Sequence, residues 1–232
     1  VQSAVRTLAE QCLLNANIVS GDVIKRIEAI IAELDRKLTE QINLILHAEE
    51  FQRVESAWRG LHYLCTHTET DEMLKIKVMN ISKKDLGKVM KKFKGTNWDQ
   101  SPIFKKMYEA EYGQFGGEPY GCLVGDYHFD HSPPDVELLG EISKVSAAIH
   151  APFITGAAPS LMGMESWQEL PDIKDITAKF LTPEHAAWRA LREDEDSRYI
   201  GLAMPRFLAR YPYGAKTSPV EEFNFEEVTA GG

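Results

Sequence analysis

Residues 120–135 read YGCLVGDYHFDHSPPD, and this stretch decides the fold. The apolar run from Cys122 to Val124 is typical of a buried β-strand, and the polar residues after it mark the end of that strand. Ser132 followed by Pro133 predicts the start of a helix, with Asp135 three residues after the cap. The stretch therefore predicts a strand that leads directly into a helix.

The same succession continues on both sides of this stretch. Three further segments have strand character: LKIKVMNI (74–81), which alternates apolar and polar residues, APFITGA (151–157) and RYIGLAMP (198–205). Helices are predicted between them, including one that Ser82 and Asp85 start as a capping box and one that Thr182 caps. Alternating strands and helices at this spacing favour parallel crossovers. We predict an α/β fold, with long N-terminal helices followed by a layered α/β body whose sheet is mostly parallel or mixed.

The first seventy residues predict helices. Ser3 and Ser20 are candidate N-caps, and the helix after Ser20 carries an apolar stripe with alternating spacings of three and four. The stripe consists of Ile24, Ile27, Ile31, Leu34 and Leu38. It fits two interpretations, a helix packed on its own domain or a helix that pairs with a second chain. We divide the chain into a helical region (1–70), an α/β domain (71–214) and a linker (215–232).

Composition limits the class of protein. The 232 residues are 44% hydrophobic and carry a formal net charge of −9, which is typical of a globular protein and argues against nucleic-acid binding. No apolar run is long enough to insert into a membrane, so we expect a cytoplasmic protein. Cys12, Cys65 and Cys122 lie in apolar surroundings without CxxC spacing, which predicts buried free thiols.

The opening stretch also raises one catalytic alternative. Asp126, His128, Asp130 and His131 spell DxHxDH, which is one residue short of the HxHxDH pattern of metallo-β-lactamase-like hydrolases. A dinuclear zinc site needs further histidines and a bridging carboxylate, and only His150 and His185 follow. No nucleophile elbow, phosphate loop or dinucleotide fingerprint is present, so we expect no catalytic residue and no cofactor. A metal-dependent hydrolase remains the alternative.

Four segments in order resemble one family across nearly the whole chain. They are ESAWRGLHYL (55–64), YGCLVGDYHF (120–129), APFITGAAPSLMG with ESWQEL (151–170), and MPRFLARYPYG (204–214). Together they resemble the large subunit of the contractile sheath of the bacterial type VI secretion system. Members of that family are longer at both ends, so we expect this chain to be part of a longer protein.

The resemblance implies a structural protein without enzymatic activity, located in the bacterial cytoplasm. It implies pairing with a small sheath subunit and polymerisation with further copies of the large subunit around an inner tube of secreted ring protein. A baseplate and a recycling AAA+ ATPase complete the implied assembly. Contraction would release free energy held in subunit interfaces that can repack.

Two regions are our candidates for partner binding. The stripe from Ile24 to Leu38 is the candidate for pairing with the small subunit, because a two-helix seam needs apolar residues at that spacing. The second candidate is RFLARYPYG (206–214), since arginine and tyrosine are frequent at the centres of interfaces. Its candidate residues are Arg206, Arg210, Tyr211 and Tyr213. The alternative for this second region is a packed turn in which the two arginines bond backbone carbonyls.

Overall fold

The computed structural model describes Arg6 and residues 23–228. The predicted caps at Ser3 and Ser20 and the predicted thiol of Cys12 lie outside the described residues. The described chain forms two compact units, one from residues 23–76 with 208–228 and the other from residues 77–207. We describe each unit by itself.

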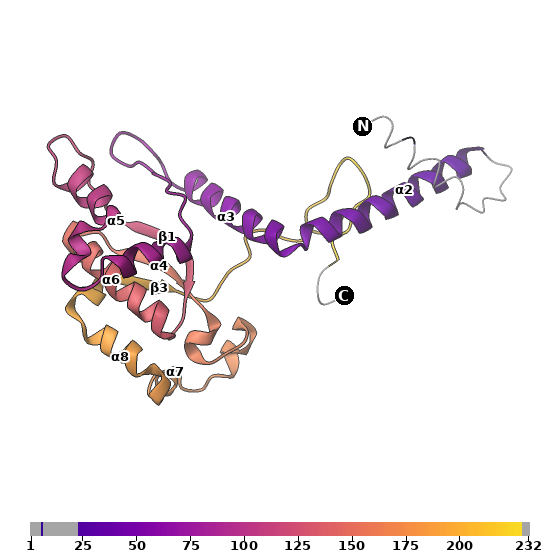
Figure 1. The fold of residues 1–232 in the computed structure, drawn as a ribbon. Coiled ribbons are helices and arrows are strands. Elements are labelled where there is room, and N and C mark those ends of the chain that lie inside the picture. The colour runs from indigo at the N-terminus through magenta and orange to yellow at the C-terminus, as the bar shows by residue number, and fades with distance from the viewer. Residues whose placement is uncertain (1–5, 7–22, 229–232) are drawn as a thin grey trace. The chain divides into compact units, whose positions relative to one another are not determined.

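The first unit contains the two long helices that the sequence predicts. Helix α2 spans Val23–Leu46 and helix α3 spans Glu49–Thr66 (Figure 1). The negative charges of Glu49 and Glu50 in the first turn of α3 stabilise the positive end of its helix dipole. Residues 208–228 belong to the same unit. Within them, bridges from Tyr213 and Gly214 to Ser218 close a tight turn.

The second unit is built on a three-stranded parallel sheet. Strand β1 (Leu123–Phe129) pairs with β2 (Phe153–Ala157), which pairs with β3 (Ile200–Ala203), in the order β1-β2-β3. The register of β1 shifts between Gly125 and His128, so Asp126 and Tyr127 form an irregularity of the strand. Three of the four predicted strands are thus present, and the predicted α/β fold is confirmed, with all three strands of the sheet parallel.

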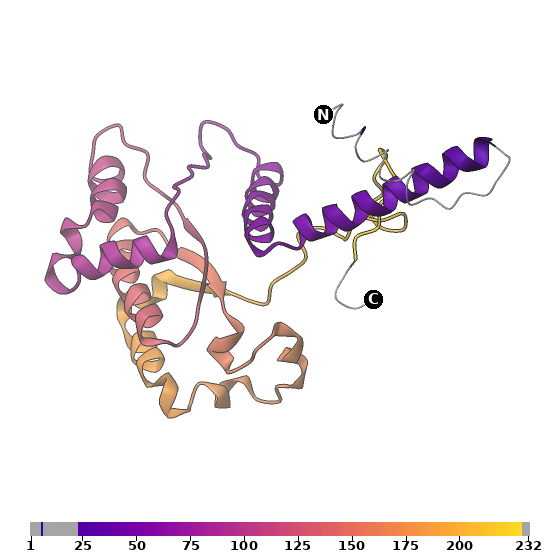
Figure 2. The same cartoon turned by 45° about the vertical axis from the view of Figure 1, so that its right-hand side comes forward.

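The core of this unit lies between the sheet and helices on one of its faces. Helix α6 (Pro133–Ile149) connects β1 to β2, and helix α8 (Ala186–Glu193) precedes β3 (Figures 1 and 2). Phe129 and Phe153 from the sheet pack with Leu139 of α6 and Trp188 of α8. The other elements are α4 (Lys83–Lys92), η1 (Gly95–Gln100), α5 (Pro102–Phe104), the π-helix η2 (Lys105–Tyr112), η3 (Pro159–Met162), η4 (Trp167–Asp172), α7 (Ile176–Lys179), η5 (Pro183–His185) and η6 (Glu195–Tyr199).

The strand predicted at 74–81 is wrong. These residues form no helix and no strand, and Leu74, Val78 and Met79 are exposed rather than half-buried. An alternating sequence becomes a strand only when a neighbouring strand accepts and donates its backbone hydrogen bonds, and the described chain supplies none here.

The predicted N-cap residues lie at the starts of helices, but only some of their side chains make the expected capping hydrogen bond. Ser82 caps α4 as predicted, because its side chain accepts a hydrogen bond from the amide of Asp85. Helix α6 follows Ser132 and η5 follows Thr182, but neither side chain makes a capping bond. Asp130 instead accepts from the amide of Ser132.

The two thiols within the described residues are free, as predicted, but they are not buried. Cys65 and Cys122 are both exposed. Cys65 is an exposed residue of the last turn of α3, and Cys122 lies just before β1 rather than within it. Partial burial of the sulfur still raises the pKa of the Cys122 thiol, which makes an activated thiolate unfavourable.

Candidate partner-binding surface

The predicted apolar stripe of α2 is largely exposed. Ile24, Ile27, Ile31 and Leu38 expose 67%, 52%, 51% and 39% of their area, and Leu34 is half-buried. A helix packed on its own domain buries such a face, because each covered aliphatic side chain contributes about 1.5–3 kcal/mol. Among the described residues, Ile27, Ile31 and Leu38 thus remain largely exposed, whereas Leu34 is partly covered. A row of exposed aliphatic side chains on one helix face is the kind of surface that proteins use for interactions.

Helix α3 carries a second exposed stripe that was not among the predicted site residues. Phe51, Val54 and Trp58 stand three and four residues apart and are all exposed, with Trp58 at 68%. Exposed tryptophan is frequent at the centre of protein interfaces. The helical spacing was visible in the sequence, but spacing alone does not distinguish a face turned toward the protein core from a face turned toward a partner.

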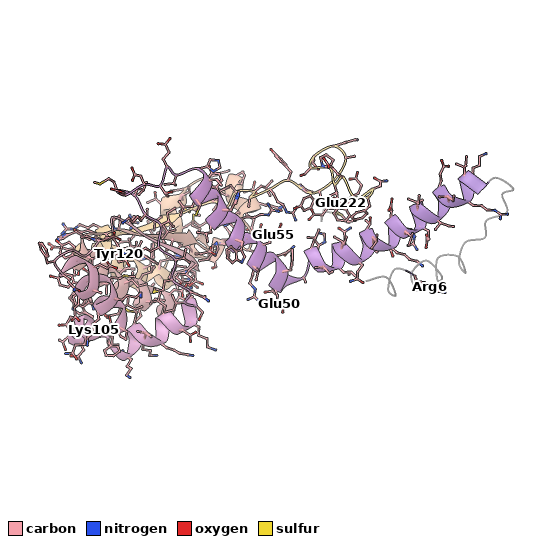
Figure 3. All side chains as sticks on the ribbon, turned by 90° about the horizontal axis from the view of Figure 1, so that it is seen from above. Arg6, Glu50, Glu55, Lys105, Tyr120 and Glu222 are labelled. Carbon is pink, nitrogen blue, oxygen red and sulfur yellow. The ribbon has the colours of Figure 1, made fainter. Side chains whose placement is uncertain are left out.

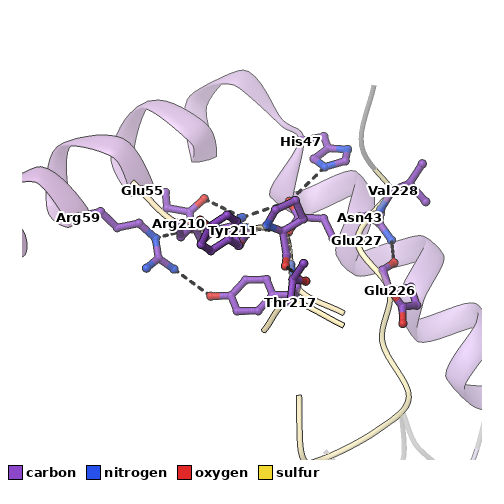
Figure 4. Close-up of polar contacts among 12 residues, drawn as sticks. Asn43, His47, Glu55, Arg59, Arg210, Tyr211, Thr217, Glu226, Glu227 and Val228 are labelled. Carbon is purple, nitrogen blue, oxygen red and sulfur yellow. Dashed lines mark hydrogen bonds and ion pairs between the residues drawn. The ribbon is translucent and has the colours of Figure 1, made fainter. Parts of the chain in front are cut away.

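Arg210 connects the C-terminal segment of the first unit to α3. Its Nε lies 2.6 Å from Oε1 of Glu55, which is labelled on α3 in Figure 3, and its Nη1 lies 2.7 Å from Oε2 of Glu227. The same Glu227 oxygen accepts from the amide of Tyr213 at 2.9 Å, and the Arg210 guanidinium lies over the Tyr213 ring. Figure 4 shows Arg210 between the two carboxylates. We call Glu55, Arg210 and Glu227 the Arg210 node.

The charges of the Arg210 node stabilise one another. Hydrogen bonds from Arg210 lower the pKa of Glu55 and of Glu227, and the amide of Tyr213 lowers that of Glu227 further. The bonds to Glu227 and then to Glu55 raise the pKa of Arg210. All three groups are thus charged at neutral pH. A guanidinium suits this position because its planar fork can bond two carboxylates at once.

Two further contacts hold the end of this segment on α2 (Figure 4). The side-chain amide of Asn43 donates to the backbone oxygen of Glu226 at 3.1 Å and accepts from the amide of Val228 at 2.9 Å. This paired bonding resembles one rung of a β-ladder. Phe225, just before these residues, is buried. The segment therefore has a defined path along the helices.

The four candidate residues in RFLARYPYG have different surroundings. Arg210 is the central residue of the Arg210 node. Tyr213 lies next to the node, and its hydroxyl accepts a hydrogen bond from Arg59 at 2.9 Å. Arg210 makes one bond to a backbone carbonyl, that of Tyr211, but its main partners are carboxylates. Tyr211 and Arg206 are exposed. Neither the predicted interface nor the predicted packed turn includes this ion-pair cluster, which lies within the first unit.

The residues of the hydrolase alternative do not gather into a metal site. Asp126 and His128 lie on the exposed side of β1, whereas Asp130 follows the strand and bonds the amide of Ser132 and the hydroxyl of Ser160. Across the described residues, no three side chains of His, Cys, Asp or Glu come close enough to hold a metal ion. Burial and then the charge of Arg206 lower the pKa of His128.

His131 takes part in packing. Its ring stacks on the buried ring of His185 with the centroids 4.2 Å apart. The His185 ring nitrogens are within hydrogen-bond distance of the Leu161 carbonyl at 2.7 Å and the Thr182 hydroxyl at 2.6 Å. Both nitrogens of His185 are therefore engaged, and the pair fastens the end of β1 to the segment that starts η5.

Comparison with known proteins identifies the class. Residues 28–232 match the VipB family, described as EvpB/VC_A0108, tail sheath N-terminal domain, and the chain belongs to this family. In particular, it is 71% identical over 231 residues to the type VI secretion system sheath protein TssC1 of Pseudomonas aeruginosa strain PAO1. The match includes 100% of this chain and 46% of that protein, so the chain spans about half the length of the curated relative it matches. None of the described helices is long and apolar enough to cross a membrane.

Proposed function

We propose that the chain is the N-terminal part of a structural subunit of a type VI secretion system contractile sheath. The observation that carries this proposal is the 71% identity, along the entire chain, to a protein named as a sheath protein of that system. The membership in a tail sheath domain family supports the same conclusion.

In this proposal the protein works through interfaces and catalyses no reaction. It pairs with a small sheath subunit in the bacterial cytoplasm, and the pairs polymerise around an inner tube that starts at a baseplate. A AAA+ ATPase recycles the contracted polymer. Free energy is held in subunit contacts that repack on contraction. The exposed apolar side chains on α2 and α3 support this role, because exposed apolar rows on helices are typical of interaction surfaces.

We place the contact with the small subunit on the α2 stripe. Ile24, Ile27 and Ile31 form a row on one side of a helix of 24 residues, which suits packing against a partner helix. Burying each of these side chains contributes about 1.5–3 kcal/mol. Three of them together therefore contribute at most about 4.5–9 kcal/mol, which makes this row a main part of the seam without accounting for the whole interface.

Co-purification with a tagged small sheath subunit tests this assignment. Ile27→Asp combined with Ile31→Asp should abolish recovery of the pair, since two carboxylates would have to enter an apolar seam. The matched control is Gln41→Asp, which adds a negative charge at an exposed position of the same helix and should leave recovery unchanged. Circular dichroism of the double variant should show its helices intact.

The possible outcomes distinguish a wrong contact surface from a wrong function. Recovery that is unchanged in the double variant rejects the α2 stripe as the contact. A full-length sheath protein carrying this chain that forms no tubes in electron micrographs when expressed with the small subunit rejects the function itself.

A further inference from the structure

Residues 213–227 of the first unit form a loop whose two ends meet. The backbone amide of Tyr213 donates to the Glu227 carboxylate at 2.9 Å, and the backbone amide of Glu227 donates to the Tyr213 carbonyl at 2.8 Å. The fifteen residues from Tyr213 to Glu227 thus leave one place and return to it, as the chain does in an Ω-loop. We call residues 213–227 the Tyr213 loop.

The Tyr213 loop is packed by its own side chains. The ring of Phe225 lies 6.3 Å from that of Tyr213 and 5.5 Å from that of Phe223, centroid to centroid, and Phe225 is buried. Near the tip, the amide of Ala215 donates to the Glu226 carboxylate at 3.0 Å. Because these contacts join residues of the same short segment, the loop can open and close as one piece.

One carboxylate closes the loop. Besides the Tyr213 amide, the Glu227 carboxylate contacts Nη1 of Arg210 at 2.7 Å and Nε2 of His47 at 3.4 Å. The Glu227 side chain is only 7% exposed, so it relies on these donors rather than on water. The closure of the Tyr213 loop therefore depends on a single residue.

The closed loop keeps part of the chain out of the path of a pulling force. Tension applied on both sides of the loop passes from residue 213 to residue 227 through their mutual bonds, because that path is shorter than the backbone between them. The thirteen residues 214–226 are slack as long as these bonds hold. An extended chain spans at most about 3.3–3.6 Å per residue, so opening of the loop adds up to about 45 Å.

We propose that the Tyr213 loop is a reserve of chain length, which opens under tension and closes again when the tension falls. The family is described as an N-terminal domain and the match includes 46% of the P. aeruginosa relative, so the loop lies on the connection from this domain to the remainder of such a protein. The use of the reserve rests on the proposed sheath function, in which subunit contacts repack during contraction. A connection that lengthens allows this displacement without unfolding the helices.

Pulling single molecules in optical tweezers tests the proposal. The existing cysteines are replaced by Cys12→Ser, Cys65→Ser and Cys122→Ser. Handles are then attached at Ala209→Cys, an exposed position just before the loop, and at a cysteine added after Gly232. Only the residues between the two handles carry the force, so the helices of the first unit and the second unit are not pulled.

We expect one reversible step that lengthens the molecule by up to about 45 Å. In Glu227→Ala, the ratio of closed to open molecules at a given force should fall by about tenfold or more, because the loop loses the charged acceptor that closes it. The matched control is Glu221→Ala, which removes an exposed glutamate of the same loop and should leave the step unchanged.

Three outcomes overturn the proposal. They are smooth stretching without a step, a step that does not reverse when the force is lowered, and a step that Glu227→Ala leaves unchanged. The proposed sheath function would stand in each case, because it is tested by tube formation. Conversely, a full-length protein that forms no tubes would reject the sheath function and leave the opening of the loop as measured.

Discussion

The Arg210 node allows a quantitative prediction about how the C-terminal segment is held. Arg210→Ala removes the cation that lies between Glu55 and Glu227. The side chain of Glu227 is only 7% exposed and that of Glu55 is 17% exposed, so both carboxylates lose their main partner where water reaches them poorly. The substitution should therefore free residues 208–228 from α3 while the helix itself persists.

The magnitude follows from the contacts. Removing one partner of a fully buried ion pair costs about 3–5 kcal/mol, and exposed pairs are worth about 0–1 kcal/mol. The Arg210 side chain is 18% exposed and bonds both carboxylates, which places the node between these limits. We expect the free energy that holds the segment closed to fall by about 2 kcal/mol, which corresponds to about a thirtyfold change in the opening equilibrium.

Hydrogen exchange measures this opening directly. The backbone amide of Tyr213 donates to the Glu227 carboxylate, and the backbone amide of Glu227 donates to the Tyr213 carbonyl. In Arg210→Ala their exchange should accelerate by about thirtyfold, because they exchange through local opening. Arg210→Lys should recover only part of the protection, since an ammonium cannot bond two carboxylates as a planar fork does. Arg53→Ala, at an exposed position of α3, is the matched control.

An exchange rate in Arg210→Ala within about threefold of the parent would refute the reasoning, since about threefold corresponds to less than 1 kcal/mol. Equal acceleration in Arg53→Ala would also refute it. The loss of any positive charge in the first unit, rather than the geometry of the node, would then be responsible.

Three further predictions concern pH and packing. The two carboxylates of the Arg210 node have folded pKa values below their ordinary 4.5, so their contribution to holding residues 208–228 is complete at neutral pH and should be lost as the pH falls below 4.5. Hydrogen exchange of the 208–228 amides, normalised to intrinsic rates, measures this loss. Protection that stayed constant down to pH 3 would contradict the prediction. Lys83→Met removes an ammonium that bonds the Asp135 carboxylate of α6 and the backbone oxygen of His128 in β1, so the urea midpoint should fall by an amount equal to about 1–2 kcal/mol, whereas Lys91→Met should leave it unchanged. Gly125→Ala should destabilise the second unit by about 2 kcal/mol or more, because the added Cβ would lie 2.5 Å from the Phe153 ring, while Gly201→Ala meets its nearest neighbour at 3.7 Å and should cost under about 1 kcal/mol; similar urea midpoints for the two alanine variants would reject this account.

Local signals in the sequence determined most of the fold. The strand and helix in residues 120–135, the strands near 153 and 200, and the helices α2, α3 and α4 all follow from periodicity and from caps such as Ser82. These patterns act within a few residues, so they can be interpreted without knowing what lies nearby in space. The ordered blocks of sequence also predicted the family to which the chain belongs.

Tertiary structure decided everything that depends on partners distant in the chain. The alternation at 74–81 predicted a strand, but no neighbouring strand pairs with it among the described residues. The main partner of Arg210 on α3, Glu55, is 155 residues away, so no local pattern could assign it. His131 was a candidate ligand by spacing and became a stacking partner of His185. Burial, ion pairing and the covering of a sheet face are properties of contacts between segments, and a linear pattern specifies only one side of each contact.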